Sequence, residues 1–260
     1  MTKSVTIITG EKDSTAAGEE LGRGVRSGFG GAAADAVIVF ASAQHDYQAL
    51  LRSLAAVWGP EAWRRAVDGG ECTHMRRGEG YGHGAAVGWQ GLHVSIGGGR
   101  GLATDAVAAA RQGVTTSAGL KARRTPYQSA LVMTDALAGH TEAFVEELTV
   151  ATNGNYRFFG GGAGDDGRFH MTHVFAGLEA VSDAAVALEM LSMEPIGVGV
   201  SHGWVPASAG FRVTEVQGNR LISLNGAPAL EAFHDHAEAT GQTLPLSAPL
   251  PFSLHTLPGI

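Results

Sequence analysis

The sequence of 260 residues contains a single cysteine, Cys72. One cysteine excludes an internal disulfide and any four-cysteine metal site built by one chain. This use of cysteine fits a reducing compartment. No run approaches the roughly 18 apolar residues that a membrane span needs, and the apolar stretch at residues 4–9 is too short for a signal peptide. We therefore expect a cytoplasmic protein that is not associated with a membrane.

Basic residues are also scarce. The chain has 18 Lys and Arg against 25 Asp and Glu, which gives a formal net charge of -7. Because no basic stripe is available to neutralise phosphates, we expect no nucleic-acid partner. Hydrophobic residues make up 44% of the chain and charged residues 17%, a composition typical of an ordered globular protein. The length is sufficient for a sizeable core in one large or two modest domains.

The apolar pattern predicts that strands and helices alternate. Residues 5–8 have strand character, and Asp13 or Ser14 can cap a helix that Gly30 and Gly31 end. Residues 36–41 form a continuous apolar run of strand length, and apolar positions over residues 47–58 then share one helix face. This order predicts successive strand-helix units.

A similar order recurs about 93 residues later. Residues 130–133 repeat the apolar run at 37–40, the helix after His140 repeats the helix after His45, and the glycines at 160–164 repeat those at 69–73. We therefore expect an α/β or α+β fold of two similar strand-helix-strand lobes from an internal duplication, with repeats at about 33–114 and 127–203. The lobes should pack as one body whose β-sheets are covered by helices. A cleft between such lobes is a common place for a small ligand.

The most unusual stretch is residues 158–169, FFGGGAGDDGRF. It matches G-x-G-x-x-G, but a dinucleotide-binding loop must run into a helix, whereas residues 168–175 predict a strand. Glycines in such density occur where something approaches the backbone closely. Two interpretations remain: a strand-to-strand turn with solvated aspartates, or a loop that contacts a ligand. In the second, Arg168 would bind the carboxylate of a zwitterion, and Asp165 or Asp166 would accept from its amino group.

Several segments together resemble a known family. They are residues 158–169, 201–204 (SHGW), 213–220 and 224–230, together with 37–42 and 69–73. Taken together along the chain, these segments are similar to the FIST N-terminal domain, an intracellular sensory module. The resemblance implies a domain at 1–227, followed at 228–260 by a linker or the incomplete start of a FIST C-terminal domain.

The resemblance also implies a function. We expect a non-enzymatic signal-transduction module that binds a small ligand, such as an amino acid or related metabolite, between lobes lined by glycine-rich loops. The chain shows no kinase, cyclase or DNA-binding motif, so a separate signalling protein such as a histidine kinase or cyclase, or a homodimer partner, would read the bound state. The ligand-binding candidates are Cys72, Thr73, His74, Gly161, Gly162, Gly164, Asp165, Asp166, Arg168 and His202.

Haem is the alternative ligand. Some members of the family are described as haem-binding nitric oxide sensors, and one axial histidine would suffice for such a site. The sequence does not choose among the candidate axial ligands, which are His74, His83, His93, His170 and His202. We expect no site in which several side chains bind a metal ion directly, because His170 and His173 would face opposite sides of the strand predicted at residues 168–175.

A hydrolase is the third hypothesis. Residues 199–203 match G-x-S-x-G around Ser201, but a nucleophile elbow requires a helix next, and Trp204 and Pro206 follow. Ser201 is therefore expected to end a strand at 196–200. Cys72 beside His74 is the other candidate nucleophile, although a lone cysteine is more often a small buried side chain. We expect no catalytic residue.

Overall fold

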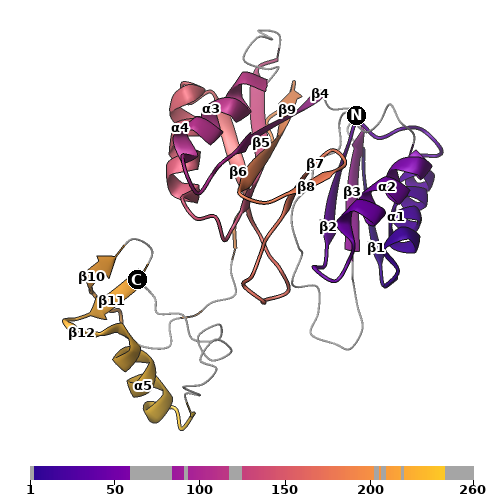
Figure 1. Cartoon of the computed structure of the whole chain (residues 1–260). Helices are drawn as coiled ribbons and strands as arrows, with labels where there is room; N and C mark the ends of the chain where they lie inside the picture. Colours follow the sequence, from indigo (N-terminus) through magenta and orange to yellow (C-terminus); the bar gives the residue numbers. More distant parts are fainter. Residues whose placement is uncertain are drawn as a thin grey trace. The chain divides into compact units, whose positions relative to one another are not determined.

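The computed structural model describes residues 3–58, 84–90, 93–116, 125–201, 205, 209–217 and 220–243. They belong to two compact units, Met1–Val198 and Gly199–Ile260 (Figure 1). The division at residue 198 comes earlier in the chain than the expected domain boundary at 227. Within the described residues no helix is long and apolar enough to cross a membrane.

The first unit alternates strands and helices, as the sequence predicts. Its elements are β1 (Lys3–Thr9), α1 (Ser14–Gly28), β2 (Ala36–Ala41), α2 (Tyr47–Trp58), β3 (Gly84–Gln90), β4 (His93–Arg100), α3 (Ala106–Thr116), β5 (Tyr127–Asp135), α4 (Thr141–Ala151), β6 (Tyr156–Ala163), β7 (Val174–Ala176), β8 (Glu179–Val181) and β9 (Ala184–Ser192).

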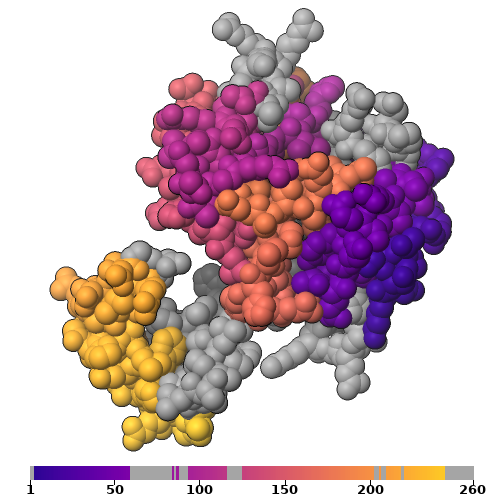
Figure 2. All heavy atoms as spheres, in the orientation of Figure 1, coloured from indigo at the N-terminus to yellow at the C-terminus, as the bar shows by residue number. Residues whose placement is uncertain are grey.

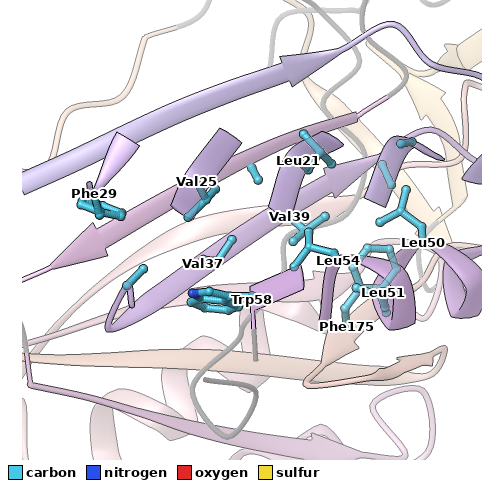
Figure 3. Close-up of a cluster of buried hydrophobic side chains, with 14 residues drawn as sticks. Leu21, Val25, Phe29, Val37, Val39, Leu50, Leu51, Leu54, Trp58 and Phe175 are labelled. Carbon is cyan, nitrogen blue, oxygen red and sulfur yellow. The ribbon is translucent and has the colours of Figure 1, made fainter. Parts of the chain in front are cut away.

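The first lobe is a sheet in the order β1-β3-β2, covered on one face by α1 and α2. Helix α1 begins where the sequence predicts, because the Asp13 carboxylate accepts a hydrogen bond of 2.8 Å from the Ala16 amide. Gly18 lets the two helices approach closely, since a Cβ at this position would lie 2.2 Å from the Leu50 carbonyl oxygen. Figure 3 shows the resulting core, in which Leu21 and Val25 of α1 face the strands and the apolar side of α2.

The second lobe is a sheet in the order β4-β9-β5-β6, covered on one face by α3 and α4. Strands β5 and β6 are parallel, and β9 is antiparallel to both β4 and β5. Helix α3 is capped by Asp105, whose carboxylate accepts a hydrogen bond of 2.9 Å from the Ala108 amide. The helix-facing core contains Leu102, Phe144 and Leu148 together with small residues of the strands.

The two sheets pack against each other through their other faces. Ala36 and Ile38 of β2 belong to one buried cluster with Met133, Val186 and Leu188 of the second lobe. The first unit is therefore layered as helices, sheet, sheet and helices (Figure 1). In Figure 2, orange atoms of the second lobe meet violet atoms of the first lobe directly. The predicted fold class, a mixed α/β fold with sheets covered by helices, is confirmed.

The lobes share a strand arrangement. In the first lobe, β3 lies between β1 and β2 and is antiparallel to both. In the second lobe, β9 lies between β4 and β5 and is antiparallel to both. A helix follows the first strand and another follows the second in each lobe. The expected repeats, at about 33–114 and 127–203, have other bounds than these lobes, because β4 and α3 belong to the second lobe. The internal duplication stays a prediction.

Two predicted strands are wrong. Residues 168–175 form a strand only from Val174 onwards, because hydrogen bonds from the backbone to Asp165 fold residues 168–171 into a loop. His170 and His173 therefore do not lie on one strand. Residues 196–200 are irregular, since their backbone pairs with no strand among the described residues. Val200 is 92% exposed.

The second lobe also contains a buried carboxyl group that the sequence did not reveal. Glu189 of β9 is 2% exposed and accepts short hydrogen bonds from the hydroxyl groups of Ser95 and Tyr156. Burial raises the pKa of Tyr156, and the hydrogen bond to Glu189 and the charge of Glu189 raise it further. Tyr156 and Ser95 therefore remain hydrogen-bond donors, and they link the edge strands β6 and β4 to β9.

The second unit is small. Its described elements are β10 (Val213–Gln217), β11 (Arg220–Leu224), β12 (Ala227–Pro228) and α5 (Ala229–Ala239). Strands β10 and β11 pair antiparallel, and β12 continues the sheet in the order β10-β11-β12. Helix α5 follows Pro228, and its residues Phe233 and Ala237 pack together.

Candidate functional site

The glycine-rich stretch lies at the carboxyl end of β6 and continues into a loop. We call residues 164–173 the Asp165 loop. Parallel strands bring their carboxyl ends to one edge of a sheet, which is a frequent position for ligand sites in open α/β sheets. Here the loop lies beside the carboxyl end of β5, its parallel neighbour.

Asp165 organises this loop. Its carboxylate is buried and accepts hydrogen bonds from the amides of Phe169 (2.8 Å), His170 (2.7 Å) and Met171 (3.2 Å). Burial raises the pKa of Asp165, but hydrogen bonds from the amides of residues 168–171 outweigh it and hold the pKa below its usual value. The side chain therefore stays ionised, and its oxygens serve the loop itself.

A second buried aspartate, Asp135, fixes the base of the loop. It ends β5 and accepts hydrogen bonds from the Leu137 amide (3.0 Å) and the Asp183 amide (2.6 Å), and a short one from the Thr172 hydroxyl. The Asp183 carboxylate in turn accepts a hydrogen bond of 2.6 Å from the Ala103 amide. Asp135 was not among the residues predicted from the sequence. Its position at the end of an apolar strand was the available signal.

The Asp165 loop also contacts the first lobe. The Ser42 hydroxyl, directly after β2, donates a hydrogen bond of 2.8 Å to the Asp166 carboxylate. The ring of Tyr47, at the start of α2, lies 5.4 Å from the His173 ring and 4.9 Å from the Phe175 ring, measured between centroids. A polar contact at the end of β2 and aromatic contacts at the start of α2 therefore join the first lobe to the Asp165 loop and to Phe175 after it.

The outer side of this region is exposed and offers backbone groups. Gly161 and Gly162 of β6 are exposed, and among the described strands β6 pairs only with β5. A Cβ at Gly161 would meet nothing within 4 Å. Arg168 is exposed, and its side chain forms no ion pair with another described residue. A guanidinium and accessible backbone amides are suited to a carboxylate or another anion.

The sequence also matches a family model. The model of the FIST N domain matches residues 35–227. The chain belongs to the FIST family. The suspected resemblance is thus confirmed, and the FIST N domain is a sensory domain from a family that is not known to be catalytic. No curated protein matches the chain.

The structure brings together six of the ten ligand-binding candidates of this FIST N domain. Gly161, Gly162, Gly164, Asp165, Asp166 and Arg168 lie in β6 and the Asp165 loop. The other candidates, which are Cys72, Thr73, His74 and His202, lie outside the described residues, as does the haem candidate His83. The structure therefore leaves the expected proximity of the two glycine segments untested.

The described candidates for haem binding and for catalysis, His93, His170 and Ser201, do not form a common site. His93 and His170 are exposed, and no group of three or more His, Cys, Asp or Glu residues within the described ranges is arranged to hold a metal ion. Ser201 is exposed and follows an irregular segment rather than a strand, so the strand half of a nucleophile elbow is missing. Its sequence neighbour His202 lies outside the described residues.

We expect Ser42→Ala to weaken the junction between the lobes. Ser42 is buried, and its hydroxyl bonds to a carboxylate, so the loss should be about 1–2 kcal/mol of unfolding free energy. Urea unfolding of Ser42→Ala, Asp166→Asn and the double variant measures the coupling. Asparagine tolerates the left-handed backbone of Asp166 (φ 59°), so Asp166→Asn keeps the loop geometry. Ser27→Ala, on the exposed side of α1, is the control. Strictly additive losses would contradict a direct bond.

Proposed function

We propose that this FIST N domain senses a small ligand with carboxylate and amino groups, an amino acid or a related metabolite, at the Asp165 loop. One observation carries the proposal: the loop that presents Arg168 beside exposed glycines is hydrogen-bonded to the other lobe through Asp166 and Ser42. A ligand at this position touches the groups that join the lobes.

The chemistry of the loop supports a ligand of this class. Arg168 is suited to bind a carboxylate through two parallel N–H groups, and β6 at Gly161 leaves room for a ligand to approach the backbone. Asp166 is the acceptor for an amino group, whereas Asp165 positions the loop because its oxygens already accept three amides. Cys72, Thr73, His74 and His202 remain proposed contributors.

Signalling would follow from a shift of population. A ligand whose amino group replaces the Ser42 hydroxyl as the hydrogen-bond donor to Asp166 would favour a different loop position from the one in the free protein. It would shift the equilibrium only by the difference between its affinities for the two states. A separate signalling protein such as a histidine kinase or cyclase would then read the loop position.

The proposal is tested by thermal unfolding in the presence of each of the twenty amino acids. We expect at least one to raise the melting temperature with a concentration dependence that saturates, since a ligand at 100 times its Kd stabilises the folded state by about 2.7 kcal/mol. Arg168→Ala should remove this stabilisation. Arg23→Ala is the matched control, because Arg23 is also exposed but lies on α1.

Two results would overturn the proposal. One is a flat response of the native protein to all twenty amino acids. The other is stabilisation that Arg168→Ala leaves unchanged. The haem alternative is examined with the same preparation by adding haemin: a sharp Soret band that is lost on replacing one histidine would make haem the ligand instead.

A further inference from the structure

Three large apolar side chains are exposed around the Asp165 loop. Leu137 is 43% exposed, Phe169 47% and Met171 56%. They belong to one region, because the Leu137 amide lies 3.4 Å from the Thr172 hydroxyl oxygen, next to Met171 in the chain. Exposed apolar groups gathered in this way mark interaction surfaces more often than scattered ones do.

Phe169 is held in a costly conformation. Its φ of 55° places a bulky residue in the left-handed region, where few residues other than glycine and asparagine are found. The hydrogen bond from its amide to the Asp165 carboxylate maintains this conformation. The ring is therefore presented to solvent from a fixed backbone, which lowers the entropy that a partner must remove on binding.

Charges of both signs flank these apolar side chains. Arg168 and His170 are exposed on the loop, whereas Glu142 is exposed in the first turn of α4. The start of α4 lies close to the end of β5, since the hydroxyl oxygens of Thr134 and Thr141 are 3.4 Å apart. A cation, apolar side chains and a carboxylate therefore share one end of the second lobe. We call Leu137, Glu142, Arg168, Phe169 and Met171 the loop patch.

We propose that the loop patch is the contact between two copies of this chain related by a twofold axis. An isologous contact requires a surface that is complementary to itself, so that one group on each copy meets its opposite on the other. Arg168 of each copy would pair with Glu142 of the second copy, with Phe169 and Met171 packed between the two ion pairs. Aromatic residues, methionine and arginine are enriched at the centre of interfaces.

The association is tested by sedimentation velocity of the ligand-free full chain over a range of concentrations. We expect a reversible monomer-dimer equilibrium. Phe169→Asn should weaken it by about tenfold or more, because a central aromatic side chain is lost. Asparagine suits a left-handed backbone, so this variant keeps the fold. Val150→Ser, which removes a 64% exposed side chain near the other end of α4, should leave the equilibrium unchanged.

Exchange of the paired charges gives the sharper test. Arg168→Glu alone and Glu142→Arg alone should each weaken the dimer, because like charges would then face each other. The double variant should restore dimer formation. A native chain that stays monomeric at every concentration would overturn the proposal, as would a dimer that Phe169→Asn leaves intact or a double variant no better than the single ones.

This test is independent of the proposed ligand site. It uses no ligand, so a failed amino-acid screen leaves it unaffected, and a monomeric protein leaves the screen unaffected. If both proposals hold, the ligand and Glu142 of the second copy compete for Arg168. The amino acid found in the screen should then increase the fraction of monomer in Val150→Ser and the native chain alike.

Discussion

Substitution of Gly160 by alanine is expected to prevent stable folding of the first unit. A Cβ at this position would lie 1.7 Å from the Val132 carbonyl oxygen, and the φ of 152° is one that residues with a side chain rarely adopt. The carbonyl oxygen belongs to the backbone of the paired strand β5, and the backbone of residue 160 fixes the position of a Cβ, so no side-chain rotation relieves the overlap. We expect a loss of more than about 3 kcal/mol in the free energy of unfolding.

The neighbouring glycine provides a matched control. Gly161 lies in the same strand, but its Cβ would meet nothing within 4 Å. Gly161→Ala should therefore change the free energy of unfolding, measured with urea, by no more than a surface substitution does, about 0.5 kcal/mol. Equal effects of the two substitutions would contradict the close approach of β6 to β5. The pair also separates the two functions of glycine in this run, which are close strand packing at 160 and open access at 161.

Substitution of Asp165 by asparagine is the second change with a large expected effect. An asparagine has one acceptor oxygen and an amide group that would point at backbone N–H groups, so at least one of the three amides of residues 169–171 loses its partner. Since these are bonds to a buried ionised group, we expect a loss of about 2–4 kcal/mol at neutral pH.

The effect should depend on pH. The folded-state pKa of Asp165 is lower than its unfolded value of about 3.9, so its charge stabilises the fold above that value. The contribution is lost as the pH falls from there through the folded-state pKa. Native chain and Asp165→Asn should therefore differ most above about pH 5 and converge in acid.

Urea unfolding at several pH values measures this difference. Asp13→Asn is the control, because asparagine caps a helix about as well as aspartate and Asp13 is exposed. A difference between the native chain and Asp165→Asn that stays constant from pH 7 to pH 3 would show that the charge of Asp165 does not stabilise the loop.

Regular elements were predictable from the sequence where local signals agree. The cap at Asp13, the apolar face of α1 and the glycines after it all point to one helix, and the structure has it. The apolar run of β2 was equally clear, since it is buried on both faces between α1 and α2 and the second sheet. In these places the pattern along the chain determines the structure.

The candidate site was only partly predictable, because its geometry depends on contacts distant in sequence. The segment after Asp165 has the apolar and β-branched residues of a strand, yet the Asp165 carboxylate draws its amides into a loop. The partner of Asp166 is 124 residues earlier in the chain, at Ser42. No local pattern indicates such a pairing. Composition did indicate the general position of the site, because a dense glycine run before two aspartates is unusual.

The central place of β9 has a consequence for how the chain folds. Among the described strands, β4 pairs only with β9, which is made about 90 residues later, so β4 leaves the ribosome long before its partner exists. Such distant pairing slows folding, since a long loop must close before any contact stabilises it. The second lobe therefore assembles its sheet only after residues 184–192 are synthesised. Until then β4 lacks its strand partner, and unpaired strands with exposed apolar residues are prone to aggregate.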